Sequence, residues 1–119
     1  MKKILIVDDE DSFRKVLASQ LKLKGWAVLE AMDGLEGVDL AGAHKPDIIL
    51  TDVQMDNMNG FMMVESLRQF PATASIPVIM MTSAAAAAGA WNSDMAVEYL
   101  EKPFTVAKLL EVINQVLKK

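Results

Sequence analysis

Four consecutive apolar residues near the start of the chain run directly into two acids, in the stretch Ile4-Leu5-Ile6-Val7-Asp8-Asp9. Two more solid apolar runs follow, Ile48-Ile49-Leu50 and Val78-Ile79-Met80-Met81. None of the three alternates apolar with polar residues, and unbroken runs are typical of strands covered on both faces of a parallel sheet. Weaker strand patterns lie at Trp26 to Glu30 and at Val97 to Leu100. The sequence therefore predicts five strands.

A helical pattern follows the first strand. It begins near Ser12 and ends before Gly25, because glycine favours a helix stop. Its apolar residues keep helical spacing and are expected to face the core: Phe13, Val16, Leu17 and Leu21.

Further helical patterns follow the other strands. The last one begins after Thr105, whose side chain is a favourable N-cap. The other three lie at Gly34 to Ala43, Phe61 to Phe70 and Ala84 to Trp91. Strand and helix thus alternate five times, which predicts a doubly wound α/β fold with helices on both faces of a five-stranded parallel sheet. A length of 119 residues predicts a single domain over residues 1–119.

Composition excludes several classes of protein. With 52% hydrophobic and 24% charged residues, the chain is not intrinsically disordered. The absence of cysteine excludes a disulfide scaffold, a Cys-bound zinc and a thiol nucleophile. The net charge is -4 and the basic residues are scattered, so we expect no direct binding to nucleic acid. No apolar run is long enough to span a bilayer, and acids interrupt the signal-peptide-like start, so we expect a cytoplasmic protein without membrane insertion.

Polar residues stand where four of the five predicted strands end. Asp8 and Asp9 follow the first strand, Asp52 the third, Thr82 the fourth and Lys102 the fifth. In a doubly wound sheet the carboxyl ends of the strands meet at one edge, and ligands bind there. We therefore expect these five side chains at the same edge of the sheet.

Each of these residues also has an ordinary structural interpretation. An aspartate after a strand is often a helix cap or a turn residue. Three carboxylates at one edge, however, repel one another unless positive charge offsets them. Mg²⁺ prefers a few carboxylates plus waters as ligands, and Lys102 would add a further positive charge. The combined pattern therefore favours a divalent cation site.

The same residues carry a resemblance to a known family. The chain resembles the receiver (CheY-like) domain of a two-component response regulator, and the similarity extends over nearly its whole length. The resemblance implies a flavodoxin-like (βα)5 fold with strand order 2-1-3-4-5, in which strands one and three are neighbours. The matching segments are Ile4 to Glu10, Lys45 to Asp52, Met55 to Gly60, Pro77 to Thr82 and Lys102-Pro103-Phe104.

The resemblance implies a role for each acid. Asp52 corresponds to the phosphoacceptor, which takes a phosphoryl group from a phosphohistidine of a kinase. Asp9 corresponds to a direct ligand of Mg²⁺ or another divalent cation such as Mn²⁺, and Asp8 to a ligand that acts through water. Asp52 itself and the backbone carbonyl of Gln54 complete the implied set of protein ligands.

The resemblance also implies a phosphoryl-binding pair and a switch. Lys102 and Thr82 correspond to the residues that bind the phosphoryl group, and Thr82 and Tyr99 to the switch. Tyr99 has an alternative interpretation as a half-buried strand aromatic. The implied output face consists of the fourth predicted helix, the fifth strand and the last helix. Among the departures from the family pattern, Asp56 replaces a usual proline, and the run Ala84 to Ala88 replaces mixed polar residues.

Partners and rival functions follow from the resemblance. It implies a sensor histidine kinase or phosphotransfer protein upstream, and a downstream protein effector or an output domain outside this sequence. We expect a signalling domain that catalyses its own phosphorylation and dephosphorylation, not a turnover enzyme. One rival is a phosphatase with an aspartyl nucleophile after the first strand, which would favour Asp-x-Asp over the adjacent Asp8 and Asp9. The other is a pseudo-receiver, which the intact set of polar residues disfavours.

Overall fold

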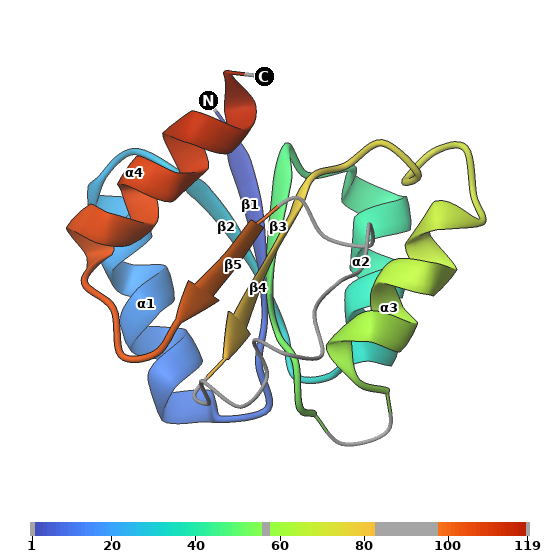
Figure 1. Ribbon diagram of the computed structural model, residues 1–119, viewed down its shortest axis with the longest axis horizontal. Helices are drawn as coiled ribbons and strands as arrows, with labels where there is room; N and C mark the ends of the chain where they lie inside the picture. Colours follow the sequence, from blue (N-terminus) through green and yellow to red (C-terminus); the bar gives the residue numbers. More distant parts are fainter. Residues whose placement is uncertain (1, 56–57, 83–97, 119) are drawn as a thin grey trace.

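The structure is a computed structural model that describes residues 2–55, 58–82 and 98–118 (Figure 1). Five strands lie at Lys3–Val7 (β1), Ala27–Ala31 (β2), Ile48–Asp52 (β3), Val78–Thr82 (β4) and Glu98–Glu101 (β5). The helices in these ranges lie at Asp11–Leu23 (α1), Gly34–His44 (α2), Gly60–Arg68 (α3) and Val106–Leu117 (α4). None of these helices is long and apolar enough to cross a membrane.

The strands form one sheet in the order β2-β1-β3-β4-β5, and every neighbouring pair is parallel. The predicted doubly wound, flavodoxin-like fold with order 2-1-3-4-5 is therefore confirmed. The chain starts at β1, one strand in from the edge, moves to that edge at β2, and returns past β1 to add β3, β4 and β5 on the other side. As a result, α1 and α4 cover one face and α2 and α3 cover the other (Figure 1).

The unbroken apolar runs are explained by burial on both faces of the sheet. On β1, Ile4 and Ile6 pack toward α1 and α4, whereas Leu5 and Val7 pack toward α2 and α3. All four side chains are 0% exposed. Full burial of such a side chain contributes about 1.5–3 kcal/mol, so the central strands hold the two helical layers together.

One prediction about α1 is wrong. Val16 was expected to face the core with its apolar neighbours, but it is 60% exposed. Arg14 is buried instead, at 6% exposure, and its guanidinium forms ion pairs with Asp11 and Glu30. These partners allow a charged residue to occupy an inward position of the helix.

The helix ends follow the sequence signals with one exception. Gly25 comes shortly after α1 with a φ of 94°, a left-handed conformation that glycine adopts without strain. Thr105 caps α4, and its hydroxyl accepts the backbone amide three residues on. The third helix was expected to reach Phe70 but ends at Arg68, where the chain tightens: the amide of Phe70 donates to the carbonyl of Leu67, three residues back.

Some predictions fall at residues 56–57 and 83–97, outside the described ranges. They are the helix at Ala84 to Trp91 with its alanine run, the start of the fifth strand at Val97, and the effect of Asp56.

Gly60 places α3 directly against the end of β3. Its amide donates to the carbonyl of Val53 at 2.8 Å. A Cβ at this position would lie 2.6 Å from the carbonyl oxygen of Asp52, closer than side-chain carbons approach backbone. Only glycine therefore allows the helix to begin so close to Asp52.

The variant Gly60→Ala should lower the free energy of unfolding by roughly 1–3 kcal/mol, because the backbone of Asp52 or of α3 must move to admit the methyl group. Gly42→Ala in α2 is the matched control, since a Cβ at that position would meet no described atom of another element within 4 Å. That control should be neutral or stabilising by up to about 1 kcal/mol. Urea denaturation measures the free energy of unfolding of both variants. Equal effects of the two substitutions on this quantity would contradict the steric argument.

Candidate functional site

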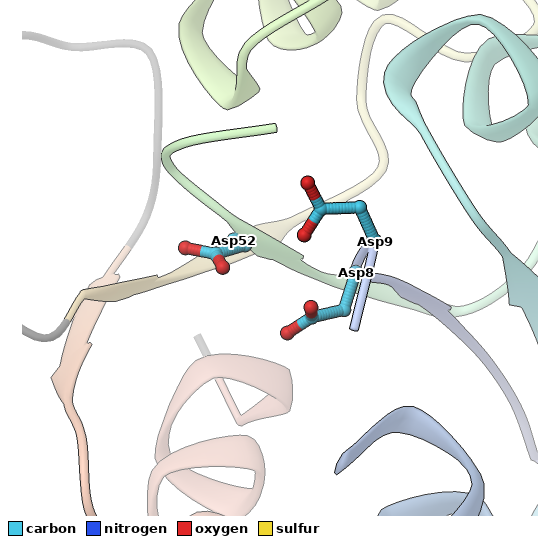
Figure 2. A group of neighbouring side chains, drawn as sticks. All are labelled: Asp8, Asp9 and Asp52. Carbon is cyan, nitrogen blue, oxygen red and sulfur yellow. The ribbon is translucent and has the colours of Figure 1, made fainter. Parts of the chain in front are cut away.

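The polar residues that follow the strands meet at one edge of the sheet. Asp52 is the last residue of β3, and Asp8 and Asp9 come directly after β1. These strands are neighbours, with Val7 paired to Thr51. Figure 2 shows the three aspartate side chains projecting from the two strand ends. The expected convergence of the acids is therefore present.

The three carboxylates are close enough to share one cation. One ligand oxygen from each of Asp8, Asp9 and Asp52 lies within 4.8 Å of the others. Opposite ligands of an octahedral Mg²⁺ are roughly 4.2 Å apart, since each Mg–O distance is about 2.1 Å, so a movement of about 0.6 Å or less would bring these oxygens within the span of one ion. Asp8 is buried, Asp52 is half-buried and Asp9 is exposed, so the cluster opens to solvent on one side. An oxygen-only donor set of this size fits Mg²⁺ or Mn²⁺ with waters in the remaining positions.

Lys102 supplies the positive charge that was expected at this edge. Its Nζ lies 3.1 Å from Asp8 Oδ2 and 3.2 Å from Asp52 Oδ2. Burial by itself lowers the pKa of Lys102, but the charges of Asp52 and Asp8 outweigh burial and raise the pKa above its ordinary value. The ammonium therefore stays protonated and bridges two of the three acids.

An aromatic contact supports the same ammonium. Lys102 Nζ lies 4.4 Å from the ring centroid of Phe13, within the range of a cation–π interaction. The Phe104 ring packs edge-on against Phe13, with centroids 6.1 Å apart. From the sequence, Phe13 was expected only as part of the apolar face of a helix. Its position one helical turn beyond Asp9 is the signal that could have indicated a contact with the site.

Asp52 has a raised pKa. Burial is the main cause, and the negative charge of Asp8 adds to it, whereas the charge of Lys102 acts in the opposite direction. The amide of Gln54 also donates to Asp52 Oδ1 at 3.4 Å. Burial and the neighbouring acid therefore make the Asp52 carboxylate more basic than a free aspartate.

Thr82 and Tyr99 lie on the same face of the sheet. Tyr99 pairs with Met80 across β4 and β5, and both pack toward α2 and α3. Thr82 is two residues after Met80, so it shares that face. Thr82 is buried, and its carbonyl accepts the backbone amide of Lys102 at 2.6 Å. The two residues expected to form a switch are therefore diagonal neighbours at the edge of the sheet.

Comparison with known sequences identifies the family. Residues 4–114 match the family described as the response regulator receiver domain. The chain belongs to this family. The resemblance seen in the sequence is therefore confirmed, and the receiver is a domain of two-component signalling.

The receiver is similar to proteins of different lengths. It is 39% identical to protein PilH of Pseudomonas aeruginosa, over 98% of this chain and 98% of PilH. It is 33% identical to the DNA-binding dual master transcriptional regulator RpaA of Synechocystis, over 100% of this chain but 50% of RpaA. Among solved structures, the chemotaxis protein CheY4 of Vibrio cholerae matches with a TM-score of 0.89 and 31% identity, over 98% of each chain. The receiver thus spans all of one relative and about half of another.

In metal-free receiver, the carboxyl of Asp52 should titrate with a midpoint above 3.8, its ordinary value. Because the folded-state pKa exceeds the unfolded one, this group should reduce the free energy of unfolding as pH rises through that window. Carbon NMR of the carboxyl measures the midpoint. Lys102→Met should raise it further by removing the attractive charge, and Mg²⁺ should lower it in the wild type. A midpoint in Lys102→Met at or below the wild-type value would contradict this description of the site.

Proposed function

We propose that the chain accepts a phosphoryl group on Asp52 in a reaction that depends on Mg²⁺ or Mn²⁺. The observation that carries the proposal is the arrangement around Lys102, whose ammonium contacts both Asp8 and Asp52. A nucleophilic carboxylate, a cluster of acids able to bind a dication, and a fixed ammonium are the parts that phosphoryl transfer needs. Such a reaction depends mainly on positioning and on neutralising charge.

In the proposed reaction, a carboxylate oxygen of Asp52 attacks the phosphorus of a phosphohistidine on the donor protein. An oxygen–phosphorus bond forms and the phosphorus–nitrogen bond breaks, and the imidazole leaves with the bonding electron pair and takes up a proton. Lys102 and Thr82 would donate to the phosphoryl oxygens. Asp8, Asp9, Asp52 and the carbonyl of Gln54 would hold the metal ion, which when bound neutralises charge on the transferred group.

Dephosphorylation would use the same groups. Water attacks the phosphorus of the acyl phosphate, the bond to the Asp52 oxygen breaks, and inorganic phosphate leaves. Each phosphoryl group that Asp52 accepts is then released as one phosphate ion. On this proposal the chain catalyses its own modification and its removal, and it is not a turnover enzyme.

The partners we propose are of two kinds. A sensor histidine kinase or a phosphotransfer protein would supply the phosphoryl group. A downstream protein effector, or an output domain outside this sequence, would respond to the phosphoryl group. The match covers 98% of PilH but 50% of RpaA, so the relatives include a protein about as long as this chain and one about twice as long. We propose that residues 1–119 form one receiver domain, located in the cytoplasm and without direct contact to nucleic acid.

Asp52→Asn should abolish formation of a phosphoryl adduct, because an amide is a poor nucleophile. The measurement is intact mass after incubation with Mg²⁺ and a small phosphodonor. Asp47→Asn is the matched control, since Asp47 precedes the opposite end of β3, where it accepts the amide of Lys3 at 2.8 Å. This control should be labelled as the wild type is. Labelling of Asp52→Asn at the wild-type rate would overturn the assignment.

Other outcomes of this experiment separate the rival functions. A stable adduct on the wild type supports a receiver that is phosphorylated. Continuous release of phosphate without an adduct would favour a phosphatase. No reaction, with intact binding to partners, would favour a pseudo-receiver.

We propose that Thr82 and Tyr99 convert the modification into a change of shape. A phosphoryl group on Asp52 brings strong acceptor oxygens to the strand ends. The hydroxyl of Thr82 would turn toward one of them, and this movement would vacate space that the ring of Tyr99 could then enter. Phosphorylation would thereby favour one of two packed arrangements over the other.

Thr82→Ala should leave labelling of Asp52 largely intact and should reduce the movement of Tyr99. The comparison is between NMR spectra recorded with and without a beryllofluoride mimic of the phosphoryl group. Thr82→Ser is the control, because it retains the hydroxyl and should respond as the wild type does. Unchanged Tyr99 resonances in wild type with the mimic bound at Asp52 would refute the proposed switch.

A further inference from the structure

Arg14 is a buried cation beneath the turn that carries the two N-terminal acids. Its side chain extends from α1 and is 6% exposed. Nη1 donates to the backbone carbonyl of Asp8 at 2.6 Å, Nη2 to Asp11 Oδ1 at 2.6 Å, and Nε to Glu30 Oε1 at 3.1 Å. One rigid guanidinium therefore connects the end of β1, the first turn of α1 and strand β2.

These contacts determine the direction of the peptide between Asp8 and Asp9. The amide of Asp8 donates to the carbonyl of Ala31 at 3.1 Å, and Asp8 Oδ1 accepts the amide of Glu10 at 2.9 Å. With the carbonyl of Asp8 held by Arg14, the backbone on both sides of this residue is anchored. The side chains of Asp8 and Asp9 leave from this backbone, so their directions depend on it.

The positive charge of Arg14 does not work against a cation at the site. Two carboxylates, Asp11 and Glu30, contact the guanidinium and offset its charge. Burial by itself lowers the pKa of Arg14, but hydrogen bonds to these two acids outweigh it and raise the pKa. The group therefore acts as a fixed hydrogen-bond donor to the turn, with its charge locally neutralised.

We propose that Arg14 is a positioning residue for the metal-binding acids: by holding the carbonyl of Asp8, it keeps Asp8 and Asp9 directed toward Asp52. This inference rests on the proposed function, because it assumes that these acids bind a divalent cation. Groups that orient metal ligands from outside the ligand set typically contribute 10–100-fold to metal affinity. The turn should lose this preorganisation when the guanidinium is absent.

The test compares the Mg²⁺ dissociation constants of folded variants by calorimetry. Arg14→Met keeps the length of the side chain and should weaken binding by about 10–100-fold. Lys15→Met is the matched control: it also removes one positive charge near Glu30, 4.0 Å from Lys15 Nζ, but this side chain is 67% exposed and does not hold the turn. The control should bind Mg²⁺ as the wild type does.

Arg14→Lys tests geometry at constant charge. A single ammonium cannot reproduce three directed contacts, so its affinity should lie between those of Arg14→Met and the wild type. If Arg14→Met does not fold, Arg14→Lys becomes the variant that tests the inference. Wild-type affinity for Mg²⁺ in Arg14→Lys would then overturn it. Urea denaturation of the same variants separates the roles: a lower free energy of unfolding with an unchanged Mg²⁺ dissociation constant would show a structural role only.

Failure of the two proposals can be distinguished. A wild-type protein that binds no Mg²⁺ overturns both the metal site and the role of Arg14. A wild type that binds Mg²⁺, with equal affinity in folded Arg14→Met, overturns the role of Arg14 alone.

Discussion

Repulsion among three carboxylates is the constraint on which the arrangement of the site depends. Asp8, Asp9 and Asp52 bring ligand oxygens within 4.8 Å of one another, and Asp8 is 0% exposed. A buried carboxylate without a compensating charge is strongly unfavourable. Lys102 contacts two of the acids and formally leaves two negative charges, which is the charge that a dication would neutralise. The same cluster is therefore tolerated without metal and suited to bind one.

The acid cluster lies at the carboxyl edge of the sheet. The apolar runs of the central strands, such as Ile4 to Val7 in β1 and Val78 to Met81 in β4, are covered by helices on both faces, so the acids of the site lie where the strands end. The strand order places β1 beside β3, and this adjacency brings acids far apart in the sequence into contact. Gly60 then allows α3 to begin close to Asp52. Fold and site thus follow from one pattern, apolar strands that end in charged residues.

This pattern explains which features the sequence could predict. The strands themselves and the placement of polar residues at one edge of the sheet followed from local runs and strand ends. The strand order, and with it the convergence of the acids that follow β1 and β3, came from the family resemblance. Arg14 was not predicted, because a charged residue in a helix normally indicates the solvent face. Its burial depends on Glu30, which lies on strand β2 and is 16 positions away in the sequence. The contact of Lys102 with Phe13 is equally non-local, so only the folded structure could reveal it.

The backbone offers a direct route from the charge at the site to the proposed switch. The ammonium of Lys102 contacts Asp52, and the backbone amide of Lys102 donates to the carbonyl of Thr82. Phosphorylation would replace the single charge of a carboxylate by roughly −1.5 to −2 and would bring new acceptors within reach of both residues. A shift of Lys102 toward the phosphoryl group therefore acts on the end of β4 as well as on its own side chain. Because β4 and β5 are paired from Ile79–Glu98 to Thr82–Glu101, Tyr99 lies within the element that such a shift would strain. In the proposed switch, the electrostatic change and the movement of the ring would thus be two effects on the same strand pair, and no separate relay would be needed between them.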